Sequence, residues 1–157
     1  MNFNNQIAEL QQQIETIAEQ DEACQRLMEI PGIGPLASTL MLAAVGNGSA
    51  SRRGRDFSAW LGIVPAHASA GGKSRLLGIS KQGNKYLRQL FVHGGRSCKT
   101  HMNREKHPFG EWVTALEKRS HSNFVSVALA NKIARIAWSV VARGERYRAH
   151  GPVAQVA

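Results

Sequence analysis

The sequence predicts an all-α fold, and three observations support this prediction. Apolar residues recur every three to four positions along the first and last segments, as on one face of a helix. Glycine and proline stand where helices would begin and end, and no segment alternates convincingly as a strand would. A length of 157 residues with 43% hydrophobic residues suits one domain with a real core. We expect a coiled-coil connecting helix over 1–26, a helical domain over 27–148 and a flexible tail over 149–157.

The first segment has the apolar spacing of a coiled coil. Its apolar residues alternate at three- and four-residue intervals at Phe3, Ile7, Leu10, Ile14, Ile17, Cys24 and Met28. Such a narrow stripe cannot bury itself on an isolated helix. A second copy of the chain, a segment that would precede Met1, or the helix's own domain could each cover it. We expect a homo-oligomer formed through this helix.

The next segment resembles a helix-hairpin-helix motif. Pro31 ends one helix, Gly32 and Gly34 tighten the turn, and Pro35 suits the first turn of the following helix. Backbone N–H groups at that helix start can bind a DNA phosphate without reading sequence. Gly32 and Gly34 are therefore candidate nucleic-acid contacts. A purely structural corner between two helices has a similar pattern.

A short helix capped by Asp56 and ending at Gly62 precedes a loop of small residues, Val64 to Ile79. Ser69 lies in this loop, shortly before a pair of glycines that would let a bulky ligand approach closely. A hydroxyl between bare backbone and cations is suited to a phosphodiester, although a loop that only contacts phosphate has the same composition. The candidate nucleic-acid contacts here are Gly71, Gly72, Lys73 and Arg75.

Ser80 is the expected N-cap of the next helix. Lys81, Lys85 and Arg88 repeat on it at i, i+4 and i+7, which makes a cationic stripe. A basic stripe that leads out of a glycine loop suits contact with a phosphate backbone. Two more helices follow, one opened by Pro108 and one running from about Phe124 to Arg143.

The charge is divided unevenly along the chain. Residues 1–30 hold six acids and one base, whereas residues 51–106 hold twelve bases and two acids. A net charge of +9 concentrated in this way favours a nucleic-acid binder over a merely solvated basic surface. The histidines are scattered without metal-ligand spacing, so we expect no metal or cofactor in this chain. Two isolated cysteines, no secretory signal and no apolar run of about 20 residues predict a cytoplasmic protein that does not bind membranes.

Five ordered motifs together resemble one protein family. They are Ile30-Pro31-Gly32-Ile33-Gly34, the run from Phe57 to Pro65, Ser69-Ala70-Gly71-Gly72-Lys73, the run from Gly78 to Arg88, and the run from Ala128 to Trp138. Their order is similar to the C-terminal domain of the Piv/MooV-type recombinases and of the bridge-RNA-guided insertion-sequence transposases of the 110/1111 group. The resemblance covers about Leu27 to Tyr147.

The resemblance implies a function in DNA transposition. In that family a RuvC-like domain carries acids that bind Mg²⁺, and a serine of the C-terminal domain attacks a DNA phosphodiester. The serine position falls on Ser69, and Ala70 stands where many relatives have a second hydroxyl. The implied partners are DNA and a guide (bridge) RNA, with Mg²⁺ expected only together with the RuvC-like domain.

The resemblance also implies that the RuvC-like half is missing, since Met1 falls where the connecting helix should begin. We therefore expect a truncated transposase whose own activity is doubtful. One alternative is a non-catalytic nucleic-acid-binding module or an inactive transposase remnant. Another is a self-associating helical protein with an incidental basic face.

Overall fold

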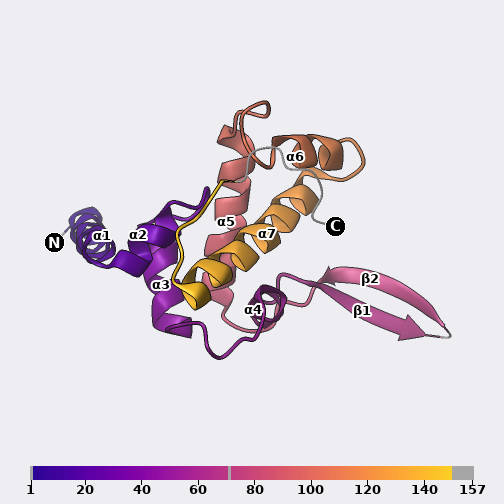
Figure 1. Ribbon diagram of the computed structural model, residues 1–157, viewed down its shortest axis with the longest axis horizontal. Coiled ribbons are helices and arrows are strands. Elements are labelled where there is room, and N and C mark those ends of the chain that lie inside the picture. The colour runs from indigo at the N-terminus through magenta and orange to yellow at the C-terminus, as the bar shows by residue number, and fades with distance from the viewer. Residues whose placement is uncertain (1, 71, 150–157) are drawn as a thin grey trace.

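The computed structural model describes residues 2–70 and 72–149 as seven helices and one pair of strands (Figure 1). In chain order these are α1 (Phe3–Gln20), α2 (Glu22–Met28), α3 (Pro35–Val45), α4 (Gly54–Leu61), β1 (Pro65–Ala70), β2 (Lys73–Ile79), α5 (Lys85–His101), α6 (Gly110–Glu117) and α7 (Ser122–Arg143). Between Pro65 and Leu77 the description is of the backbone, apart from Gly72.

The core lies where α5 and α7 cross, with the shorter helices packed around them (Figure 1). Its largest fully buried side chains come from six of the seven helices and the turns between them: Phe57, Phe91, Leu27, Ile30, Met41, Leu61, Ile63, Leu87, Leu129, Ile133, Val113 and Val125. The all-α prediction is therefore confirmed, because helices supply this core and the two strands stand outside it.

Glycines allow the backbone of α5 to lie close to two other backbone segments. A Cβ atom on Gly95 would lie 2.6 Å from the carbonyl oxygen of Ser126 and 2.9 Å from the amide nitrogen of Ala130, both on α7. A Cβ atom on Gly94 would overlap the carbonyl oxygen of Gly32. Both glycines are buried, so α5 approaches α7 on one side and the turn between α2 and α3 on the other.

The single helix predicted for the N-terminal segment is interrupted at Asp21. This residue has extended backbone angles (φ −103°, ψ 119°), and its carboxylate accepts a hydrogen bond of 3.0 Å from the backbone N–H of Cys24. Aspartate is a strong N-cap residue, so it ends α1 and begins α2. The break separates two environments: Cys24 and Leu27 of α2 are buried, whereas Phe3 of α1 is 80% exposed.

The loop predicted from Val64 to Ile79 is instead an antiparallel hairpin. His67 pairs with Leu76, Ala68 with Arg75, Ser69 with Ser74 and Ala70 with Lys73, and the register shifts between Pro65 and His67. The strands pair with each other and project from the helical core (Figure 1). β1 contains alanine and serine in place of alternating β-branched residues, so the period-two signal is absent from its sequence.

The predicted N-cap of the following helix is also wrong. α5 begins at Lys85, and its cap is Asn84, whose side-chain oxygen accepts a 2.9 Å hydrogen bond from the backbone N–H of Leu87. The backbone N–H of Ser80 instead donates to the carbonyl of Val64, 3.0 Å away. The segment between β2 and α5 is thereby attached to the end of α4.

By length and composition, α7 is the one helix in the described part of the chain that could cross a membrane. Its buried side chains, among them Leu129, Ile133 and Val140, pack in the core against α4 and α5. This is the environment of the central helix of a globular domain.

Candidate nucleic-acid interface

Ser69 lies on β1, one pair from the end of the ladder, opposite Ser74. Gly72 has a φ of +77°, and no atom lies within 4 Å of the place where its Cβ would be. A left-handed backbone of this kind favours glycine. Gly71 and the side chains of Ser69, Lys73 and Arg75 lie outside the described residues.

A groove of about 330 Å³ runs along one face of α5 at the foot of the hairpin. Its walls come from Ile79, Lys81, Lys85, Arg88, Gln89, Val92, His93 and Arg96. The helical members recur at i, i+3, i+4, i+7, i+8 and i+11, so they share one face. Among these lining residues, all of them described, four are cationic and none is acidic. We call this feature the basic groove; it can hold an anion of extended shape.

Lys81 has an unusual backbone at the entrance of the basic groove. Its φ is +56°, the one positive value among the described non-glycine residues. The conformation is fixed because the backbone N–H of Lys81 donates to the carbonyl of Gly62, 3.1 Å away. A side chain in this region costs about 1 kcal/mol or more, and asparagine tolerates it better than lysine does. The Lys81 side chain is exposed, so this strained backbone places its ammonium group at the entrance of the basic groove.

Arg88 has a structural contact that its place in the predicted stripe did not suggest. Its side chain is buried, with the residue only 9% exposed. One guanidinium nitrogen, Nη1, donates to the carbonyls of Leu61 at 3.1 Å and Gln82 at 2.8 Å. These bonds join α5 to the end of α4 and to the segment that carries Lys81. Arg88 therefore supports the floor of the basic groove, while a phosphate contact by Arg88 stays a prediction.

Gly32 and Gly34 occupy different environments in the turn between α2 and α3. Gly32 has a φ of +90°, and its Cβ would lie 2.7 Å from the carbonyl oxygen of Gly94. It therefore packs against α5. Gly34 is exposed with open space around it and precedes Pro35, the first residue of α3, as predicted. Nucleic-acid binding by these two glycines stays a prediction.

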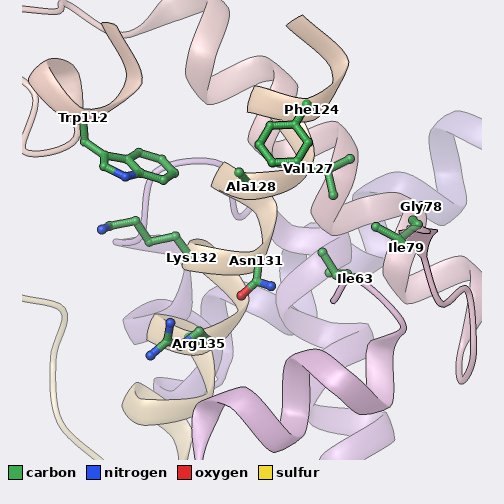
Figure 2. A pocket seen from close by; sticks show the side chains of 10 residues that line it. All are labelled: Ile63, Gly78, Ile79, Trp112, Phe124, Val127, Ala128, Asn131, Lys132 and Arg135. Carbon is green, nitrogen blue, oxygen red and sulfur yellow. The ribbon is translucent and has the colours of Figure 1, made fainter. Parts of the chain in front are cut away.

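A second hollow, of about 410 Å³, shares the lining residue Ile79 with the basic groove. Its walls come from Ile63, Gly78, Ile79, Trp112, Phe124, Val127, Ala128, Asn131, Lys132 and Arg135 (Figure 2). Six of these residues lie on α7 with the same one-face spacing that the basic groove has on α5. We call this feature the aromatic hollow.

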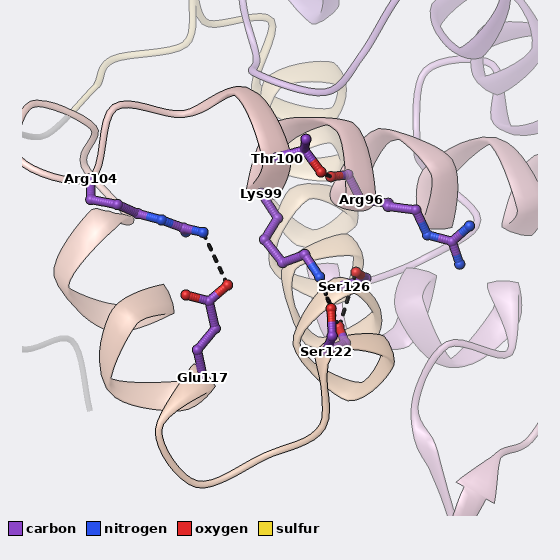
Figure 3. Close-up of polar contacts among 7 residues, drawn as sticks. All are labelled: Arg96, Lys99, Thr100, Arg104, Glu117, Ser122 and Ser126. Carbon is purple, nitrogen blue, oxygen red and sulfur yellow. Dashed lines mark hydrogen bonds and ion pairs between the residues drawn. The ribbon is translucent and has the colours of Figure 1, made fainter.

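Polar contacts fix the helices that form these two features (Figure 3). The ammonium of Lys99, a largely buried residue of α5, donates to both the carbonyl and the hydroxyl of Ser122 at the start of α7. Arg104 pairs with Glu117 of α6 at 3.0 Å. These contacts tie the end of α5 to α6 and α7.

The two cysteines are free and buried. Burial raises the pKa of both Cys24 and Cys98, so each is a neutral thiol near pH 7. The described residues contain no group of three or more His, Cys, Asp or Glu side chains that could hold a metal ion.

Arg96 and the aromatic hollow were missing from the sequence-based candidates. Arg96 lies eight residues beyond Arg88, and the helical spacing from Lys85 would have found it had the stripe been followed further. The aromatic hollow combines residues from the hairpin, α6 and α7. No pattern within a single segment of the sequence predicts such a combination.

Comparison with known proteins identifies the class. The model of the family described as "Transposase IS116/IS110/IS902 family" matches residues 24–110, more than half of the chain. The chain belongs to this transposase family.

Curated relatives agree with this assignment. The chain is 43% identical over 139 residues to "Transposase for insertion sequence element IS1328" of Yersinia enterocolitica, an alignment that covers 88% of the chain and 42% of the relative. It is 39% identical over 148 residues to "Transposase for insertion sequence element IS1111A" of Coxiella burnetii, covering 94% and 41% respectively. A "Probable family 20 transposase" of Pseudomonas aeruginosa is 42% identical over 142 residues, covering 90% and 42%. The chain thus spans about two fifths of the length of these relatives.

Proposed function

We propose that this chain is the DNA-binding C-terminal part of an insertion-sequence transposase and acts in DNA transposition. The observation that supports DNA binding is the basic groove, where Lys81, Lys85 and Arg96 present exposed cations without a neighbouring carboxylate. Cations in such an arrangement bind phosphates and release counterions, independently of base sequence. The family assignment makes DNA the natural ligand.

The double variant Lys81→Asn/Lys85→Gln should bind duplex DNA more weakly at 0.1 M salt. Asparagine accepts the left-handed backbone at position 81, so the fold is kept while two phosphate contacts are lost. The slope of log K against log[salt] should become shallower by about 2. Fluorescence anisotropy with a labelled 20-base-pair duplex at several salt concentrations measures both quantities.

The matched control is Lys118→Gln/Arg119→Gln. It removes the same number of charges from exposed positions just after α6, outside both lined features. Its salt slope should equal that of the unchanged chain. An equal loss of DNA affinity in both double variants would mean that binding depends on the overall positive charge and not on the basic groove. The proposal would then be wrong.

We further propose that Ser69 is the nucleophile. The serine oxygen would form an ester bond to phosphorus, one P–O bond of the DNA strand would break, and the leaving oxygen would end as a hydroxyl. The acids that bind Mg²⁺ would belong to a RuvC-like half, since the described residues hold no such cluster. A non-catalytic binding module remains the second candidate, because the basic groove does not depend on Ser69.

The remaining parts of the proposal concern partners and location. A guide (bridge) RNA and a cytoplasmic location follow from the resemblance and the composition. Self-association is supported by α1, whose Phe3, Ile7, Leu10 and Ile17 are all more than half exposed on a stripe with coiled-coil spacing. Light scattering should give a mass above 17.2 kDa for the chain, falling to that value in Ile7→Glu/Leu10→Glu. A monomeric unchanged chain would contradict this part.

A further inference from the structure

The aromatic hollow has the composition of a site for a flat, polar ring. Trp112 and Phe124 face it from α6 and α7, with Ala128 between them on its floor (Figure 2). Phe124 is 54% exposed, so a ligand can reach its ring. The volume of the aromatic hollow, about 410 Å³, is within the range of small-molecule sites, roughly 300–1,000 Å³.

The polar groups of the aromatic hollow are positioned to read an edge and hold a charge. Asn131 lies near the centre of the hollow (Figure 2). Among the described residues, none makes a hydrogen bond with its amide. An amide offers both a donor and an acceptor, as the edge of a nucleobase does. Arg135, one turn further along α7, is exposed at the margin of the hollow.

Lys132 gives the aromatic hollow a partly dehydrated cation. Its ammonium lies 4.8 Å from the centre of the Trp112 ring and 5.2 Å from that of Phe109. Burial, and then the nearby charge of Arg135, lower the pKa of Lys132 below its usual value. A cation with reduced hydration gains more from a carbonyl or phosphate oxygen than a fully hydrated one does.

We propose that the aromatic hollow binds an unpaired nucleotide, with its base beside Trp112 and Phe124, its edge at Asn131 and its phosphate at Arg135. This inference rests on the proposed function, because the hollow adjoins the basic groove at Ile79. A strand whose phosphates follow the basic groove can therefore place one base in the hollow. Bases of DNA and RNA share the required chemistry: an aromatic face and a polar edge.

Charge favours a nucleotide over a peptide segment as the occupant. The lining residues, all described, carry two cations and no carboxylate, and one wall is continuous with the basic groove. A polyanion with flat rings matches both properties. A second protein chain would match only the apolar part.

Trp112 emission reports directly on occupancy. The chain has three tryptophans, so Trp60→Phe/Trp138→Phe leaves Trp112 as the sole indole. Titration with a thymidine decamer and a uridine decamer should quench this emission, and the stronger effect identifies DNA or RNA as the better ligand. A fully paired duplex of ten base pairs should bind, as followed by anisotropy, with much less quenching.

A second measurement uses the chain with all its tryptophans, so that the test does not depend on how well the single-tryptophan variant folds. Phe124→Leu keeps an apolar side chain and removes the aromatic face, which should weaken single-strand binding about tenfold and leave duplex binding unchanged. The matched control is Tyr86→Leu, which removes an aromatic residue that is 52% exposed and lies outside both lined features. It should change neither affinity.

Three outcomes would overturn the inference. If single strands and duplex bind equally and Phe124→Leu has no effect, the basic groove alone binds, and the proposed function stands without this site. If Trp112 emission depends on protein concentration but not on oligonucleotide, the hollow is a contact between chains. If neither nucleic acid binds at low salt, the proposed function itself fails.

Discussion

Replacement of Gly95 by alanine is expected to lower the free energy of unfolding by about 2–3 kcal/mol. On a typical helix the same change would stabilise by up to about 1 kcal/mol, because glycine is a poor helix former. Here the added Cβ would lie 2.6 Å from the carbonyl oxygen of Ser126 and 2.9 Å from the nitrogen of Ala130. Both are backbone atoms of α7 that cannot turn aside, so the two central helices must separate.

Urea denaturation measures this loss, and the melting temperature should fall by about 5–10 °C for a chain of this length. The matched control is Gly78→Ala, since nothing lies within 4 Å of the Cβ position at Gly78. Its stability should stay within about 0.5 kcal/mol of the unchanged chain. A Gly95→Ala variant as stable as this control would mean that α5 and α7 do not pack as closely as described.

Ser69→Ala is expected to abolish strand cleavage in an assay that supplies a RuvC-like half in trans. The substitution removes the oxygen that would bond to phosphorus, and removal of a nucleophile of this kind costs several powers of ten in rate. Covalent protein–DNA product on a denaturing gel measures the effect. Binding to duplex DNA should be unchanged, since the basic groove is intact.

Ser74→Ala is the matched control for this experiment. Ser74 pairs with Ser69 across the hairpin, so each variant removes one hydroxyl from the same pair of residues. Cleavage should survive in Ser74→Ala. Equal cleavage in both variants would make the assignment of Ser69 wrong and favour a binding module without its own chemistry.

Local signals in the sequence predicted the ends of several elements correctly. Pro35 begins α3, and Gly62 caps α4 with a left-handed backbone, because proline and glycine act through their own backbone restrictions. The buried stripe of α7 through Leu129 and Ile133 also follows from spacing alone. These features depend on neighbours in sequence.

The features that were missed are one local cap and two features that depend on residues distant in the sequence. The apolar spacing continues past Asp21, so the capping role of this aspartate was overlooked within an apparently continuous helix. Arg88 was interpreted as a surface cation because charge usually lies outside. Its burial depends on the carbonyls of Leu61 and Gln82, whose positions only the fold supplies. The aromatic hollow was missed for the same reason.

The hairpin has a consequence for when the proposed chemistry can occur. At about 3.3 Å per residue, β1 carries the backbone of Ser69 roughly 15 Å beyond Val64. Among the described residues, β1 and β2 pair with each other, and an isolated two-stranded hairpin is marginally stable, so contacts with a bound substrate would help to fix the position of this hairpin. In-line attack on phosphorus requires alignment to about 0.5 Å. If Ser69 is the nucleophile, as proposed, a serine on such a hairpin would be aligned only when its substrate binds, so recognition and reactivity would coincide and other phosphodiesters would be left intact.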